Sequence, residues 1–174
     1  MTGLKRWSAA DSLELYNIEG WGQGYFQIND AGHLIVRPIR RSEATIDLIG
    51  LIEDAQRNGL ALPLLIRFSD ILDDRLTSMR QAFQAAFESV SYQGRYFGVY
   101  PIKVNQQRQV VEEVVQFGAD YGMGLEAGSK SELHAVLAMD TSPDAVIVCN
   151  GYKDADYIRL ALIAQRLGKS VFLV

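Results

Sequence analysis

The sequence is poor in the residues that build covalent or metal-bound frameworks. A single cysteine, Cys149, excludes an internal disulfide, and with only two histidines, His33 and His134, no Cys/His cluster has zinc-ligand spacing. No apolar run approaches the roughly 20 residues that span a bilayer. The first residues lack the apolar stretch of a signal peptide. These absences predict a folded protein of a reducing compartment, and we expect it in the cytoplasm.

Positive charge is also scarce. The 174 residues include 17 Lys and Arg against 21 Asp and Glu, a net charge of −4. A general binder of nucleic acid or anionic membranes would carry a basic excess gathered on one face. The chain is 48% hydrophobic and has only 4 prolines, which is a globular composition. We therefore expect a small-molecule partner and neither nucleic acid nor membrane.

The first part of the chain predicts short elements. Two short strands flank Asn29–Gly32, whose Asn, Asp and Gly residues suit a hairpin loop. Apolar residues from Leu48 to Ala55 recur with helical spacing. Leu64–Phe68 reads as a buried strand, and a long helical pattern follows from Ile71 to about Val90. We expect residues 1–40 to form a lead-in with a hairpin and residues 41–174 to form the main α/β domain.

From Tyr96 onward, strands and helices alternate with a repeat of roughly 25 residues, the length of a βα unit in a parallel sheet. About five such strands are expected, whereas a closed (β/α)8 barrel needs on the order of 250 residues. The fold class predicted is α/β, a partial (β/α)8 TIM-type barrel. The chain ends on the apolar, β-prone run Val171–Val174, whose bare edge would invite association. We expect the chain to be the amino-terminal portion of a longer protein.

The most informative segment is Tyr96–Gln106, in which an apolar strand delivers Lys103 near its carboxyl end. In a βα barrel the carboxyl ends of the strands form the active-site face. Burial there disfavours the ammonium form of a lysine, and a neutral amine is what a Schiff base requires. If the strand continues to Lys103, this side chain shares a face with Val99 and Pro101. The alternative is a lysine that extends from a strand end into solvent.

Two later strand ends also carry polar residues. Glu126 lies between Gly124 and Gly128, where it could lie on the rim of the active site. The structural alternative for this stretch is the capping-box pattern that Ser129 forms with Glu132. Asn150 and Lys153 follow the next apolar strand, where turn chemistry is again the structural alternative. Cys149 is expected to be a buried core residue. The glycine run Gly122–Gly128 is a weak match to a dinucleotide fingerprint, because it follows the end of a helix.

Three strand-end segments, in this order, resemble the biosynthetic arginine decarboxylase family. They are Val99-Tyr-Pro-Ile-Lys-Val-Asn-Gln106, Gly124-Leu-Glu-Ala-Gly-Ser-Lys-Ser-Glu-Leu133 and Ile147-Val-Cys-Asn-Gly-Tyr-Lys-Asp154. Tyr16-Asn-Ile-Glu-Gly-Trp-Gly-Gln-Gly-Tyr-Phe26 and Tyr157-Ile-Arg-Leu-Ala-Leu162 are similar to it as well. The lysine segment alone places the chain among the alanine-racemase-like pyridoxal phosphate enzymes. The full sequences Tyr100-Pro-Ile-Lys-Val-Asn-Gln106 and Cys149-Asn-Gly-Tyr-Lys153 are more specific to the arginine branch.

The resemblance implies that Lys103 holds pyridoxal phosphate through a Schiff base, with Glu126, Glu132 and Asn150 near the cofactor. It implies decarboxylation of L-arginine to agmatine and CO2 in polyamine (putrescine and spermidine) biosynthesis, by a homo-oligomer with a magnesium requirement. No magnesium site is visible in these residues. Family members are several times longer than this chain, and we expect the chain to be inactive alone.

Two other classes stay open. One is a non-catalytic barrel relative that acts as a binding or regulatory module. The presence of Lys103 argues against this class, because a binding module does not need a Schiff-base lysine. The other is a Rossmann-type nucleotide-binding protein built on the run Gly122–Gly128.

Overall fold

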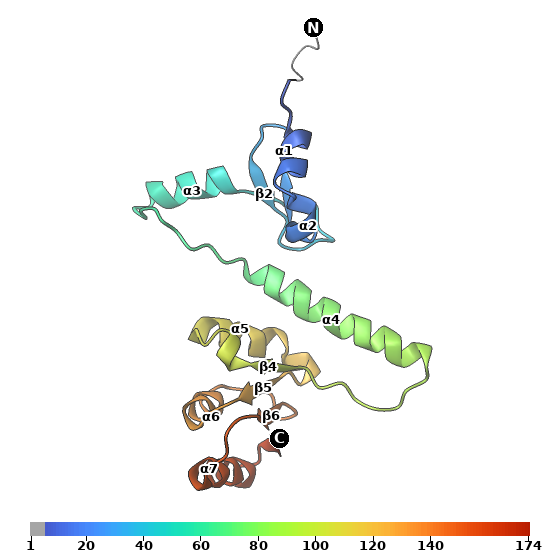
Figure 1. Ribbon diagram of the computed structural model, residues 1–174, viewed down its shortest axis with the longest axis vertical. Helices are drawn as coiled ribbons and strands as arrows, with labels where there is room; N and C mark the ends of the chain where they lie inside the picture. The colour runs from blue at the N-terminus through green and yellow to red at the C-terminus, as the bar shows by residue number, and fades with distance from the viewer. Residues whose placement is uncertain (1–5) are drawn as a thin grey trace. The chain divides into compact units, whose positions relative to one another are not determined.

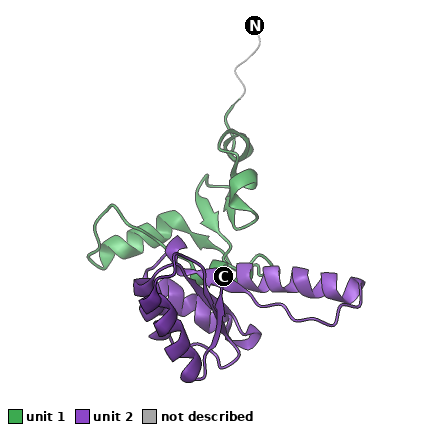
Figure 2. Cartoon of the chain, turned by 60° about the horizontal axis from the view of Figure 1, so that its bottom comes forward, with its two compact units in different colours: residues 1–74 green, residues 75–174 purple. Residues whose placement is uncertain are grey.

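The computed structural model describes residues 6–174 and divides the chain into two compact units, residues 1–74 and residues 75–174 (Figure 2). The long helix α4 (Ser69–Ser89) contains the boundary between them. No helix in the described part of the chain is long and apolar enough to cross a membrane.

The first unit contains the predicted hairpin. Strands β1 (Phe26–Ile28) and β2 (Leu34–Val36) pair antiparallel, with Phe26 opposite Val36, and β3 (Ile46–Asp47) pairs with the other edge of β2. Short helices α1 (Ala9–Leu15) and α2 (Ile18–Gly22) precede the sheet. Helix α3 (Leu48–Arg57) begins where predicted, because the Asp47 carboxylate accepts hydrogen bonds from the amides of its first turn.

The strand predicted at Leu64–Phe68 is wrong for this structure, since these residues have no regular secondary structure. Leu65 is 77% exposed. Backbone groups of an extended segment need a neighbouring strand, and none of the strands of residues 6–174 pairs with this one. The parallel sheet therefore has four strands and not the expected five.

The second unit is a parallel sheet in the order β4-β5-β6-β7 (Figure 1). Its strands are β4 (Val99–Pro101), β5 (Gly124–Ala127), β6 (Val146–Cys149) and β7 (Ser170–Leu173). They are connected by α5 (Arg108–Phe117), α6 (Lys130–Leu137) and α7 (Ala155–Arg166), with short 3-10 turns η1 (Ile102–Val104) and η2 (Ala119–Tyr121). This α/β arrangement is the one expected for part of a (β/α)8 barrel, and it confirms the predicted fold class.

The core of this unit lies between the sheet and its helices. Leu125, Ala127, Ile147 and Cys149 alternate along β5 and β6 and are all buried in one apolar cluster with residues of α5, α6 and α7. Because successive side chains of a strand point to opposite faces, Glu126 in β5 points to the other face of the sheet. That face would be the interior of a complete barrel. Cys149 is fully buried, as predicted.

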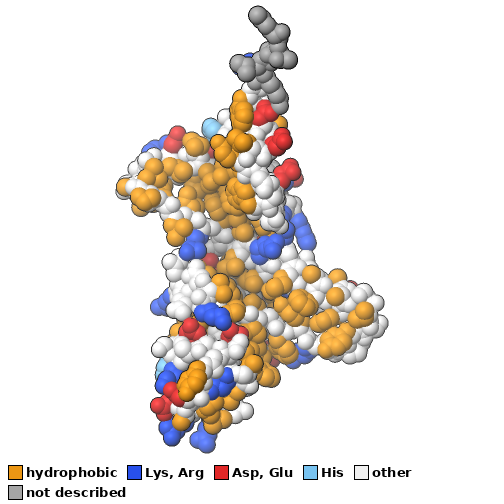
Figure 3. All heavy atoms as spheres, in the orientation of Figure 1, with side chains coloured by type: hydrophobic (Ala, Val, Ile, Leu, Met, Phe, Trp, Pro, Cys, Tyr) orange, Lys and Arg blue, Asp and Glu red, His pale blue; other side chains and the backbone are white. Residues whose placement is uncertain are grey.

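Apolar side chains also gather on the surface over α4 and the loop that follows it (Figure 3). Phe83 stacks on Tyr96 with 4.1 Å between the ring centroids, and Met79, Val90 and Tyr92 are exposed nearby in the chain.

Candidate functional site

The candidate site lies at the carboxyl edge of the parallel sheet. Register places Pro101 beside Glu126 on β4 and β5, and Ala127 beside Cys149 on β5 and β6. Lys103 follows the first of these strands and Asn150 follows the third. Parallel strands end at the same edge, so three residues from three separate segments meet there.

Lys103 lies in the η1 turn and not in a strand. The strand ends at Pro101, which has no N–H to donate to the sheet, and the chain turns immediately afterwards. Lys103 Nζ lies 3.7 Å from Oε1 of Glu126, and the Lys103 side chain is 60% exposed whereas that of Glu126 is 16% exposed. The strand does not continue to Lys103, so the face shared with Val99 and Pro101 and its buried setting do not apply. The exposed side chain agrees with the alternative of a lysine that extends from a strand end into solvent.

Glu126 connects the other two residues of the edge. Its Oε1 faces Lys103, and its Oε2 accepts a hydrogen bond from Nδ2 of Asn150 over 3.5 Å. The carboxylate is thus held between a cation and an amide donor that come from the two neighbouring strand ends. Such contacts orient a carboxylate that is otherwise mostly buried.

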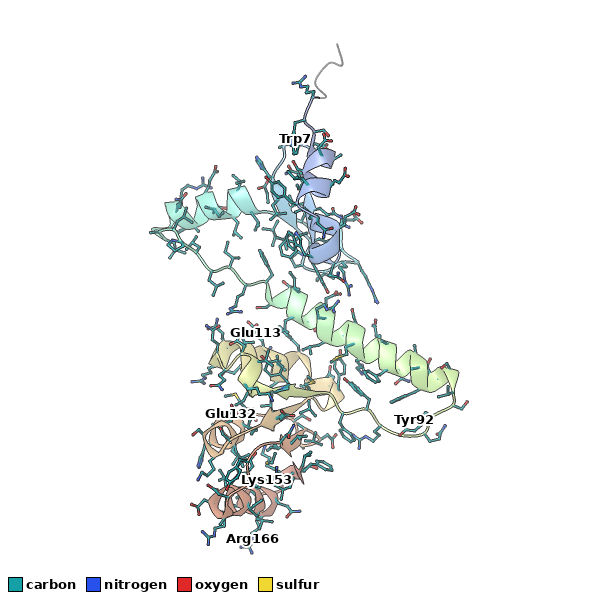
Figure 4. All side chains as sticks on the ribbon, viewed as in Figure 1. Trp7, Tyr92, Glu113, Glu132, Lys153 and Arg166 are labelled. Carbon is teal, nitrogen blue, oxygen red and sulfur yellow. The ribbon has the colours of Figure 1, made fainter. Side chains whose placement is uncertain are left out.

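Glu132 lies beside this edge in the first turn of α6 (Figure 4). Its Oε2 accepts the Gly128 amide hydrogen over 2.6 Å, and its Oε1 accepts a hydrogen bond from Gln106 Nε2 over 3.1 Å. Ser129 Oγ accepts the Glu132 amide hydrogen, as the capping pattern predicts, but Glu132 reaches one residue further back than a regular capping box. Glu132 thereby bridges the segment after Lys103 and the turn after β5.

The two other lysines of this region are engaged elsewhere. Lys130 Nζ lies 2.6 Å from Asp154 Oδ2, and this hydrogen bond raises the pKa of Lys130 and lowers that of Asp154. Lys153 Nζ donates to the carbonyl of Gly151 over 2.6 Å (Figure 4). Lys103 is thus the lysine that faces Glu126.

Two features of the site were not predicted from the sequence. A Cβ at Gly151 would lie 2.0 Å from the Gly128 carbonyl oxygen, so the turns after β5 and β6 touch backbone to backbone. Tyr157 in α7 is fully buried, and its hydroxyl donates to the carbonyl of Ala127 over 2.7 Å. From the sequence, Tyr157 is distinguished only as the first residue of the segment Tyr157–Leu162 that resembles the family, and no pattern in the sequence marks its burial or its partner.

The described residues offer no set of ligands for the magnesium ion that the resemblance implies. No group of three or more His, Cys, Asp and Glu residues within residues 6–174 could hold a metal ion.

Comparison with known proteins assigns the family. The chain is 54% identical to the biosynthetic arginine decarboxylases of Bacteroides thetaiotaomicron and Gloeobacter violaceus over 171 residues, 98% of its length. A solved structure, the biosynthetic arginine decarboxylase of Campylobacter jejuni, matches with a TM-score of 0.82 and 33% identity over 91% of the chain. The chain spans only 27% of the length of the two sequence relatives and 26% of the solved one.

The alternative of a Rossmann-type protein is wrong. Gly122 precedes β5 and Gly124 lies inside it, so these glycines do not form the strand-to-helix turn that cradles a pyrophosphate. A model of the pyridoxal-dependent decarboxylases, for their pyridoxal binding domain, matches residues 74–171. That range contains β4, β5, β6, the start of β7 and every residue of the carboxyl edge, and the chain therefore belongs to the family of pyridoxal-dependent decarboxylases.

Proposed function

We propose that this chain is the lysine-bearing part of a biosynthetic arginine decarboxylase, which removes the α-carboxylate of L-arginine as CO2 and yields agmatine. The substrate class follows the names of the relatives. The observation that carries the proposal is Lys103 Nζ at 3.7 Å from Glu126 on the carboxyl edge of the sheet. Because the chain covers 27% of those relatives, the activity is proposed for the complete protein, and the chain alone is expected to be inactive.

The residues of the edge fit pyridoxal phosphate. Lys103 offers an exposed primary amine, which a Schiff base to the cofactor aldehyde requires. Glu126 and Asn150 supply an acceptor and a donor beside it. When bound, pyridoxal phosphate supplies an electron sink for the pair of electrons left by the departing carboxylate.

The side chains at this edge are placed to accept a proton from Lys103 Nζ and to orient the acceptor. Lys103 must lose a proton from Nζ before it can act as a nucleophile, and the Glu126 carboxylate is the acceptor beside that atom. The 3.7 Å separation is longer than a hydrogen bond, as is common where a catalytic contact tightens only when the ligand binds. Asn150 holds the second oxygen of Glu126 and so keeps the first directed at Lys103. Glu132 keeps the neighbouring turn in place through Gly128.

We also propose a cytoplasmic homo-oligomer whose product feeds polyamine synthesis. No magnesium role is proposed, since the described residues offer no donor set. The non-catalytic alternative predicts the same fold but no covalent cofactor, so a label on Lys103 separates the two.

The test is reduction of the complete protein with borohydride after incubation with pyridoxal phosphate, followed by peptide mapping and an agmatine assay. We expect a phosphopyridoxyl group on Lys103, and loss of the label, the visible absorbance band and nearly all agmatine formation in Lys103→Ala. Lys169→Ala is the matched control, because Lys169 Nζ donates to Thr141 Oγ1 just before β7, at the opposite edge of the sheet. A label on Lys130 or Lys153, or none on the wild type, would contradict the proposal.

A further inference from the structure

A buried tyrosine ties the helix after β6 to the strand that carries Glu126. Tyr157 has no exposed surface, and its Oη donates to the Ala127 carbonyl oxygen over 2.7 Å. The same oxygen accepts the backbone amide hydrogen of Asn150 over 3.0 Å. One carbonyl therefore holds together α7, the residue after Glu126 and the backbone of Asn150.

Cys149 lies in the same buried apolar cluster as Tyr157. Burial raises the pKa of both the Cys149 thiol and the Tyr157 hydroxyl, so both keep their protons. The Tyr157 hydroxyl therefore acts as a neutral donor to the Ala127 carbonyl.

The position of the hydrogen bond from Tyr157 to Ala127 carries the argument. The surrounding cluster is apolar, including Leu133, Val136 and Ala161, so a phenylalanine would fill the same volume without burying a hydroxyl. The carbonyl that the hydroxyl holds belongs to the peptide between Ala127 and Gly128, one residue after Glu126. Two donors on this carbonyl hold the end of β5, α7 and the backbone of Asn150 together. The stretch of backbone from which the Glu126 side chain leaves the strand is held with them.

Resting on the proposed function, we propose that Tyr157 is a positioning residue of the pyridoxal site, which sets the Glu126–Asn150 pair against Lys103 through the Ala127 carbonyl. It touches neither the amine nor the carboxylate. Its effect is on geometry, and small misplacements of reacting groups lower rates strongly.

The test uses the complete holoenzyme and Tyr157→Phe, which removes only the hydroxyl. Tyr92→Phe is the matched control, because Tyr92 is 56% exposed and lies in the loop after α4. We expect a kcat about tenfold lower with the KM for arginine changed less than about twofold. We also expect a weaker visible circular dichroism band of bound pyridoxal phosphate, and faster amide exchange at residues 126–128 and 150 of the cofactor-free protein.

The outcomes separate this inference from the proposed function. A wild type without pyridoxal phosphate on Lys103 overturns both. A labelled wild type whose Tyr157→Phe variant keeps kcat and the dichroism band, with at most a lower melting temperature, overturns the positioning role alone. If Tyr157→Phe does not fold in buffer alone, it is measured in sucrose, which strengthens burial. A dichroism band as strong as that of the wild type in the same solution then overturns the inference.

Discussion

Lys130 Nζ lies 2.6 Å from one carboxylate oxygen of Asp154, while the other oxygen accepts the amide hydrogen of Tyr157 at the start of α7. Asp154 is thus both the N-cap of α7 and the ion-pair partner of the first residue of α6. The pair joins the turns that follow β5 and β6, which carry Gly128 and Asn150.

Replacing Asp154 separates these two roles. Asp154→Asn keeps a capping oxygen and loses the ion pair, and since both side chains are more than 40% exposed, we expect the melting temperature to fall by less than about 2 °C. Asp154→Ala also loses the cap and is expected to cost roughly 2–4 °C more. Thermal unfolding by circular dichroism at low and high salt measures both. An Asn variant as unstable as the Ala variant would show that the ion pair matters more than the cap.

Two substitutions test the role of Glu132. Glu132→Gln replaces one carboxylate oxygen, and Glu132→Ala removes both. In Glu132→Gln the amide oxygen can still accept from Gly128, so we expect a melting temperature within about 2 °C of the wild type. The bridge to Gln106 is weakened, and turnover of the complete protein should fall roughly threefold to tenfold. Glu132→Ala leaves both donors unpaired and should lower stability as well. Unchanged turnover in both variants would remove Glu132 from the site.

The contact between Gly128 and Gly151 predicts that Gly151→Ala is destabilising. The new Cβ would lie 2.0 Å from the Gly128 oxygen, and the strain should cost about 1–3 kcal/mol. Gly50→Ala in α3 is the contrasting variant, because its Cβ meets no atom within 4 Å. It should stabilise by about 0.5–1 kcal/mol, since alanine has the higher helix propensity. Urea denaturation measures both changes, and a harmless Gly151→Ala would contradict the close approach.

Asp74 predicts a dependence of stability on pH. Burial acts to raise its pKa, but hydrogen bonds from Tyr25 over 2.5 Å and from Arg40 over 2.8 Å outweigh it, and the pKa lies below its usual value of 3.8. The folded state therefore binds the proton less readily than the unfolded state. The stabilisation of the folded state by the Asp74 carboxylate is fully present above the pKa of the unfolded state. It is lost as the pH falls through the lower pKa of the folded state.

Comparing the wild type with Asp74→Asn isolates this group from Asp47 and Asp154, whose pKa values are also lowered. We expect the difference in unfolding free energy between the two proteins to shrink below about pH 3.8. A difference that stays constant from pH 6 to pH 2 would show that Asp74 does not titrate differently in the two states.

The sequence predicted which residues meet at the carboxyl edge, because parallel strands bring successive strand ends together whatever their details. The sequence did not predict that Lys103 lies in a 3-10 turn after the strand. That depends on the turn after Pro101, where strand periodicity no longer applies. Leu64–Phe68 has the composition of a buried strand, but composition cannot supply the neighbouring strand that would pair with it.

The supporting contacts were beyond the sequence for a different reason. The hydrogen bond from Tyr157 to Ala127, 30 residues earlier, depends on how α7 packs against β5, which the sequence of neither element specifies. The approach of Gly151 to Gly128 likewise depends on the register of β5 with β6, which no local pattern encodes.

The order of the strands in the parallel sheet has a consequence for synthesis on the ribosome. β4, β5, β6 and β7 are neighbours in space in the same order in which they are translated. Each new strand therefore emerges when the edge that it pairs with already exists, and its helix can cover that addition at once. Each pairing spans one βα unit, which keeps the contact order low for a parallel sheet. Lys103 is synthesised before Glu126, and the edge that holds both can form only once β5 has paired with β4.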